Sequence, residues 1–149
     1  MRVILRLIAL VVVWVVTFFG GAISYIFPET YCDVIENNWG IVIPTDRAYS
    51  EEFSADSGAS FHGDGTRYHV MYFDDAERIS YLLGWSEEIP ESIITYSEQL
   101  LDELEVNNAY HRPNYENCVY YTQSKEDGSV ILIFWDESRQ EMYVLEEFL

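Results

Sequence analysis

The sequence is poor in basic residues. Of its 149 residues only eight are Lys or Arg, against 26 Asp or Glu, which gives a formal net charge of −18 at pH 7. Nucleic-acid binding depends on clustered Lys and Arg, so we expect no DNA or RNA partner. The aromatic content of 16% is too high for an intrinsically disordered chain. The composition therefore predicts an acidic, folded protein.

Motifs that mark common reactions are missing. The sequence has no C-x-x-C, H-E-x-x-H or G-x-S-x-G pattern, which argues against a thioredoxin-like site, a zincin and a serine-hydrolase turn. Gly63 and Gly65 lack the third glycine and the following helix that a dinucleotide site requires. We therefore expect no resident cofactor.

Cysteine is scarce, with Cys32 and Cys118 as its two occurrences. In an oxidising compartment they could form a disulfide. Closing a loop of about 87 residues would stabilise the fold by roughly 4–5 kcal/mol on the chain-entropy model. The alternative is two separate thiols, with Cys118 buried among Val119, Tyr120 and Tyr121. The sequence leaves both open.

The amino-terminal segment contains a long apolar run. Arg2 and Arg6 precede Leu7–Phe27, a stretch of 21 residues without a charge. As a helix it would be roughly 31 Å long, which matches the hydrocarbon core of a bilayer. The basic residues before it predict a cytoplasmic amino terminus. We expect a transmembrane anchor at residues 1–27, with residues 28–149 outside the membrane.

Two alternatives remain for this segment. A cleaved signal peptide, cut near Gly20–Ala22 or Ala22–Ser24, would release a secreted domain. A buried core helix of a cytosolic protein is the third interpretation. The anchor and the signal peptide both export residues 28–149, which hold all 26 acidic and six of the basic residues, a formal charge of −20. This charge either keeps the domain soluble or attracts a basic partner.

The outer segment predicts an α+β domain with a mainly antiparallel sheet and two helices, in the order β-β-β-α-α-β-β-β. Two helices are expected, one capped by Asp74 or Asp75 and ended by Gly84, the other starting at Pro90 and ended by Asn107-Asn108. The run Val130–Trp135 is apolar on both faces, which indicates a central strand. The six strands are expected at Trp39–Ile43, Arg47–Asp56, Thr66–Phe73, Tyr115–Gln123, Ser129–Trp135 and Glu141–Phe148.

The most distinctive stretch is Phe61-His62-Gly63-Asp64-Gly65 with the strand after it. It resembles a Gly-rich F-H-G-D-G turn of small exported or membrane-anchored bacterial proteins of unknown function. Typical members have another His-Gly pair just before the turn, where this chain has 57–60, Ser-Gly-Ala-Ser. The resemblance implies export or anchoring and carries no activity.

The same stretch supplies the candidate catalytic and metal-binding residues. His62 and Asp64 lie near the tip of the turn, where they could bind a divalent metal. His69 is seven positions beyond His62, so in a regular strand it would face the other side. The competing interpretation is a glycine-dependent hairpin in which Asp64 caps the turn.

Our leading hypothesis is a single-pass membrane protein whose outer domain has a non-catalytic binding or accessory role toward an envelope protein. Aromatic residues could form a binding face from Tyr68, Met71 and Tyr72, or from Tyr115, Tyr120 and Tyr121. The first alternative is a His/Asp- or metal-dependent hydrolase centred on His62, Asp64 and His69. The second is an inhibitor or immunity-type protein that masks a basic partner.

Overall fold

In a computed structural model of the chain, the residues described are 29–45, 49–58 and 64–149. The chain divides after Ile43 into two compact units, and each is described by itself. Among the described residues no helix has the length and hydropathy to cross a membrane. The anchor predicted at residues 1–27 lies outside these residues.

The described part of the first unit contains one helix, α2 (Tyr31–Trp39). The Thr30 hydroxyl accepts a hydrogen bond from the Asp33 backbone N–H, and the Asp33 carboxylate accepts one from the Thr30 N–H at 2.7 Å, which makes a capping box. Gly40 ends the helix with a φ of 69°. The strand predicted at Trp39–Ile43 is therefore wrong, because Trp39 belongs to a helix and residues 40–43 form no strand.

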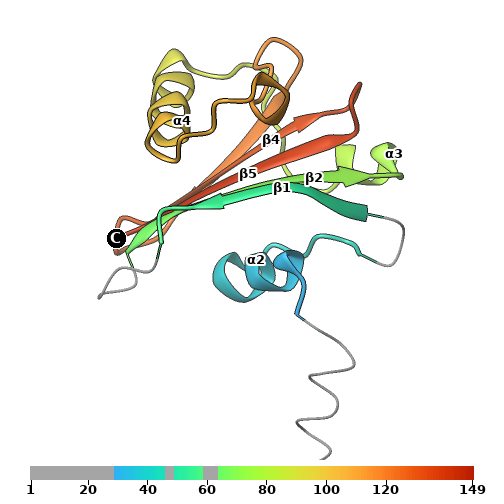
Figure 1. The fold of residues 1–149 in the computed structure, drawn as a ribbon. Helices are drawn as coiled ribbons and strands as arrows, with labels where there is room; N and C mark the ends of the chain where they lie inside the picture. The colour runs from blue at the N-terminus through green and yellow to red at the C-terminus, as the bar shows by residue number, and fades with distance from the viewer. Residues whose placement is uncertain (1–28, 46–48, 59–63) are drawn as a thin grey trace, which may run out of the picture. The chain divides into compact units, whose positions relative to one another are not determined.

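The second unit is built on a five-stranded antiparallel sheet with the order β1-β2-β5-β4-β3 (Figure 1). Hairpins join β1 to β2, β3 to β4 and β4 to β5, and the two groups meet where β2 pairs with β5. The predicted α+β class with a mainly antiparallel sheet is confirmed. The strands are β1 (Tyr49–Asp56), β2 (Gly65–Phe73), β3 (Val119–Ser124), β4 (Val130–Asp136) and β5 (Glu141–Phe148).

The central position predicted for Val130–Trp135 is confirmed. This segment is β4, paired on one side with β3 and on the other with β5, and Ile131–Trp135 is at most 1% exposed. The strand predicted from Tyr115 begins later, at Val119. Residues 115–117 form a turn instead, closed by a hydrogen bond from the Asn117 N–H to the Asn114 carbonyl at 2.9 Å.

Two helices lie between β2 and β3, as predicted, but both are shorter than expected. α3 (Ala76–Ser80) is capped by the Asp75 side chain and ends before Gly84. α4 (Glu91–Glu103) has Pro90 at its N-cap and Leu104 at its C-cap, and it goes no further because Glu105 takes a left-handed φ of 56°. A short 3-10 helix, η1 (Ala109–His111), follows and was not predicted.

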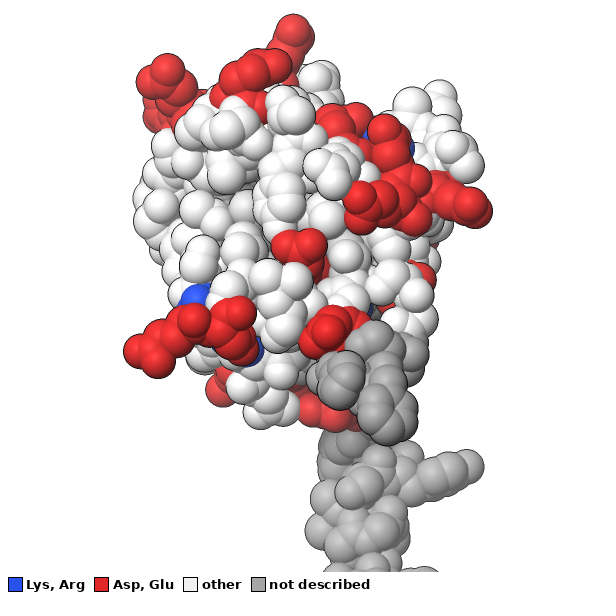
Figure 2. Space-filling model, turned by 90° about the vertical axis from the view of Figure 1, so that its left-hand side faces the viewer, with Lys and Arg blue, Asp and Glu red and all other residues white. Residues whose placement is uncertain are grey.

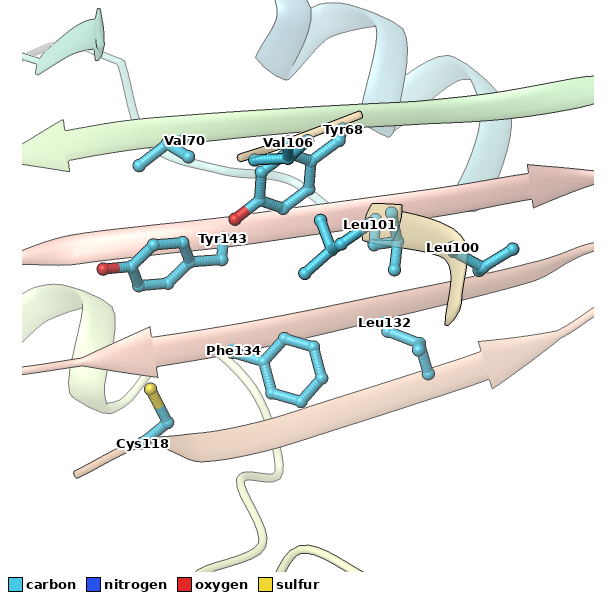
Figure 3. Close-up of a cluster of buried hydrophobic side chains, with 10 residues drawn as sticks. Tyr68, Val70, Leu100, Leu101, Val106, Cys118, Leu132, Phe134 and Tyr143 are labelled. Carbon is cyan, nitrogen blue, oxygen red and sulfur yellow. The ribbon is translucent and has the colours of Figure 1, made fainter. Parts of the chain in front are cut away.

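α4 covers one face of the sheet and buries a hydrophobic cluster against it (Figure 3). Leu100 and Leu101 of α4 are 2% and 0% exposed, and they pack above side chains of the three inner strands. The apolar stripe of α4 and the alternation of the strands thus place these residues in one core. The strand residues in the cluster are Tyr68, Val70, Leu132, Phe134, Tyr143 and Leu145.

Candidate functional site

The structure does not bring together the two described members of the predicted His/Asp site. Asp64 is exposed and directly precedes β2, whereas His69 lies in the middle of that strand. Five extended residues place them about 16 Å apart at roughly 3.3 Å per residue. His62 lies outside the described residues. Asp64 and His69 therefore do not form the acid–base pair that a hydrolase would need.

His69 instead pairs with a carboxylate of the neighbouring strand. Its Nδ1 is 3.3 Å from Oε1 of Glu51 on β1, and its side chain is only 14% exposed. Burial lowers the pKa of His69, although the nearby Glu51 and Glu146 act in the opposite direction. The imidazole is thus mainly neutral at pH 7, and it links β1 to β2.

Both cysteines are buried, and neither forms a disulfide in the structure. Cys32 belongs to the first unit and Cys118 to the second. Burial, reinforced by the charge of Asp136, raises the pKa of the Cys118 thiol to about 12. A thiol with such a pKa is protonated at neutral pH and is a poor nucleophile. The disulfide between the two cysteines stays a prediction for an oxidising compartment.

The predicted aromatic binding faces are not exposed as sets. Tyr68 and Met71 are 1% and 0% exposed, and both belong to the core. Tyr72 and Tyr115 are half-buried, as are Tyr120 and Tyr121. Among the described residues, the aromatic side chains that are largely exposed are Tyr81 and Tyr110, in the turn after α3 and in η1.

Several tyrosine hydroxyls fasten α4 and the following loop to the sheet. Tyr96 on α4 donates to the Glu147 carboxylate on β5. Tyr68 on β2 donates to the His111 carbonyl at 2.5 Å. Tyr115 donates to Oε1 of Glu98 at 2.7 Å. Burial raises the pKa of each of these phenols above its ordinary value, so they act as neutral hydrogen-bond donors.

The most one-sided charge in the described structure lies on and around α4. Residues 79–111 contain seven acidic residues and no Lys or Arg. The outer face of α4 forms a shallow hollow of about 700 Å³. Figure 2 views the molecule from the side on which α4 lies in Figure 1 and shows acidic side chains over its upper part and in further groups lower on the same face. The hollow is lined by Glu91, Ile94, Thr95, Glu98, Gln99, Asp102 and Glu103.

Arg112 binds the inner part of this acidic surface. Its Nη1 donates to Oε2 of Glu98 at 2.6 Å and its Nη2 to Oδ1 of Asp102 at 2.5 Å. Its Nε donates to the Val106 carbonyl at 2.7 Å. Glu98 and Asp102 thus form ion pairs with Arg112. Among the described residues, no ion pair joins Glu91 or Glu103 to a basic side chain. Arg112 is not among the residues predicted for a site, although the four-residue spacing of the two carboxylates on a helix places them on one face.

Comparison of the chain with known protein families, with curated proteins and with solved structures finds no match. Within the described residues, no three His, Cys, Asp or Glu side chains come together in a group that would hold a metal ion. The candidate site is therefore an acidic surface on and beside α4. We call it the acidic surface of α4; its residues are Glu91, Ile94, Thr95, Glu98, Gln99, Asp102 and Glu103, which line the hollow, together with Glu87, Glu88 and Glu105.

Proposed function

We propose that residues 44–149 form a non-catalytic binding domain and that the acidic surface of α4 binds a basic partner protein. In this proposal residues 1–27 hold the domain at the outer side of a membrane, where it acts as an accessory or an inhibitor of an envelope protein. The partner presents clustered Lys or Arg side chains.

The observation that supports the proposal is that every charged Lys, Arg, Asp or Glu side chain in residues 79–111 is acidic. Arg112 engages Glu98 and Asp102, and five acidic residues of the segment remain on the exposed side of the fold. A surface of one sign raises the local concentration of oppositely charged partners and speeds their association. Positive charge on the partner is the complement of this surface.

The potentially reactive side chains of the described structure serve the fold, which supports a binding role over a catalytic one. The Cys118 thiol is buried and protonated, and His69 is paired with Glu51 across two strands. Tyr115 is tied to Glu98 and to Ser97. These groups hold parts of the fold together rather than meeting at a common point.

The test measures binding of a ten-residue oligolysine peptide to the full-length chain in a non-ionic detergent, at several salt concentrations. A triple variant removes exposed acidic side chains of the surface while keeping their size: Glu87→Gln, Glu91→Gln and Glu103→Gln. A matched triple variant removes the same charge from exposed positions elsewhere: Glu77→Gln, Glu126→Gln and Glu137→Gln.

We expect the surface variant to bind about tenfold more weakly at low salt, and the matched variant to change by about twofold or less. Binding to the wild-type chain should weaken steeply as salt rises, because exposed charges are screened. Equal losses in the two variants would show that only total charge matters. Binding that is insensitive to salt would contradict the proposal.

A further inference from the structure

β1 is an edge strand whose outer side pairs with no strand of the described residues. It is eight residues long and lies at one end of the sheet order, with β2 on its inner side. The edge of a sheet presents backbone N–H and C=O groups with which an extended segment can pair. The opposite edge is partly occupied, because Ser86 forms an antiparallel bridge with Tyr120 of β3.

The carboxy-terminal half of β1 is apolar on the side that faces the α4 layer. Phe53 and Ala55 are opposite Val70 and Tyr68 of β2 and pack against the core cluster. Both are half-buried, and the Phe53 ring stacks on His111 with centroids 4.4 Å apart. A strand added beside β1 would place every second side chain next to this apolar row.

From Glu51 to Asp56 the other side of β1 is acidic and polar. Ser54 and Asp56 are opposite His69 and Arg67 of β2, and both are exposed. Glu51 lies on the same side, and its side chain is 39% exposed. The alternate side chains of an added strand would therefore meet two carboxylates.

We propose that the β1 edge pairs with an extended segment of a partner protein in which Lys or Arg alternate with apolar residues. Backbone hydrogen bonds to the open edge would provide the pairing, and the two chemically different sides of β1 would select the alternating pattern. This inference goes beyond the proposed function, because it concerns another element and recognition through the backbone.

The same features disfavour a second copy of this chain as the occupant. Two β1 edges side by side would bring Glu51 and Asp56 of each copy near acidic side chains of the other, and facing like charges destabilise a strand pair. The register shift between Glu51 and Phe53 marks a bulge, which also limits indiscriminate edge pairing. A basic partner strand removes the electrostatic obstacle.

The experiment uses the full-length chain in a non-ionic detergent and an eight-residue peptide of alternating Lys and Val with blocked ends. Two control peptides have the same sequence with N-methyl groups on alternate residues: one is methylated at the odd positions and the other at the even positions. A third control peptide has Glu in place of Lys. Hydrogen exchange measured by mass spectrometry reports protection of residues 49–56. At a peptide concentration of ten times the dissociation constant, exchange there should slow by about tenfold.

We expect one N-methylated register to abolish this protection and the Glu-Val peptide to give none. The variant Glu51→Gln/Asp56→Asn should bind the Lys-Val peptide about tenfold more weakly. Both replacements keep the acceptor atoms that serve His69 and the Gly58 N–H. The matched variant Glu116→Gln/Glu126→Gln, at the two ends of β3, should bind as the wild-type chain does.

Three results would overturn the inference. Protection confined to α4 would assign the peptide to the acidic surface instead. Equal binding of both N-methylated peptides and the parent would show that charge alone is recognised. Protection of β1 that depends on protein concentration without peptide would identify a second copy as the occupant.

Discussion

Replacement of Leu101 by Ala tests how firmly α4 is attached to the sheet. Leu101 is 0% exposed and lies in the cluster between α4 and the strands. The substitution removes three carbon atoms from the core, which costs about 2.4 kcal/mol of transfer free energy at about 0.8 kcal/mol per methylene. The cavity left behind adds to this cost, so we expect the free energy of unfolding to fall by about 3–4 kcal/mol.

The assay is urea unfolding of the full-length chain in a mild detergent, followed by near-ultraviolet circular dichroism. Ile94→Ala in the same helix is the matched control, because Ile94 is half-buried and lines the outer hollow. We expect that variant to lose about 1 kcal/mol or less. In thermal unfolding, Leu101→Ala should lower the midpoint by about 15 °C or more. Equal losses for the two variants would refute the packing of α4 through its Leu101 face.

Three further predictions concern single side chains. Arg112→Met should cost about 1–2 kcal/mol in the same urea assay, because it removes the guanidinium donor shared by Glu98, Asp102 and the Val106 carbonyl; an unchanged midpoint would contradict the role given to Arg112. Cys118, with its pKa near 12, should react with iodoacetamide at least about a hundredfold more slowly in the folded chain than in urea, as mass spectrometry would measure. Burial lowers the pKa of His69 from 6.5, so the unfolded chain takes up this proton at a higher pH than the folded chain does. The wild-type chain should therefore lose stability relative to His69→Gln as the pH falls below about 6.5, and parallel pH profiles would exclude this linkage.

Much of the sheet could be predicted because its signals are local. Val130–Trp135 is apolar at every position, and its short length and its β-branched and aromatic residues favour a strand covered on both faces. Glu141–Phe148 has the predicted bounds, and the Asp-Gly turn at Asp127-Gly128 separates β3 from β4. The central strand could be predicted because its own residues, apolar on both faces, indicate that both faces are buried.

The wrong predictions concern where helices begin and end. There, capping residues and backbone conformation outweigh the hydrophobic pattern. Trp39 and the Ile residues after it suggest a strand, but Thr30 and Asp33 form the capping box of a helix that continues through Trp39. Gly40 then stops the helix without starting a strand. In the same way α4 ends at Glu103 rather than at Asn107, because Glu105 adopts a left-handed conformation that no residue preference indicated.

The candidate site was harder to predict because its contacts join distant segments. The scarcity of Lys and Arg indicated an acidic surface, but it could not assign Arg112 to Glu98 and Asp102, which lie 14 and 10 positions away. Composition also could not distinguish the carboxylates that pair with Arg112 from those that remain exposed. The pairing of Glu51 with His69 likewise depends on the register of β1 against β2.

The two proposed surfaces make different demands on a partner, and salt separates them. The acidic surface of α4 requires only positive charge, so its binding should disappear as exposed charges are screened. The β1 edge adds backbone hydrogen bonds and an apolar row, which ions do not screen, so part of its binding should persist at high salt. For a partner that contacts both surfaces, the α4 variants should therefore remove the part of the binding that is sensitive to salt. N-methylation of the partner's extended segment should remove the part that persists at high salt.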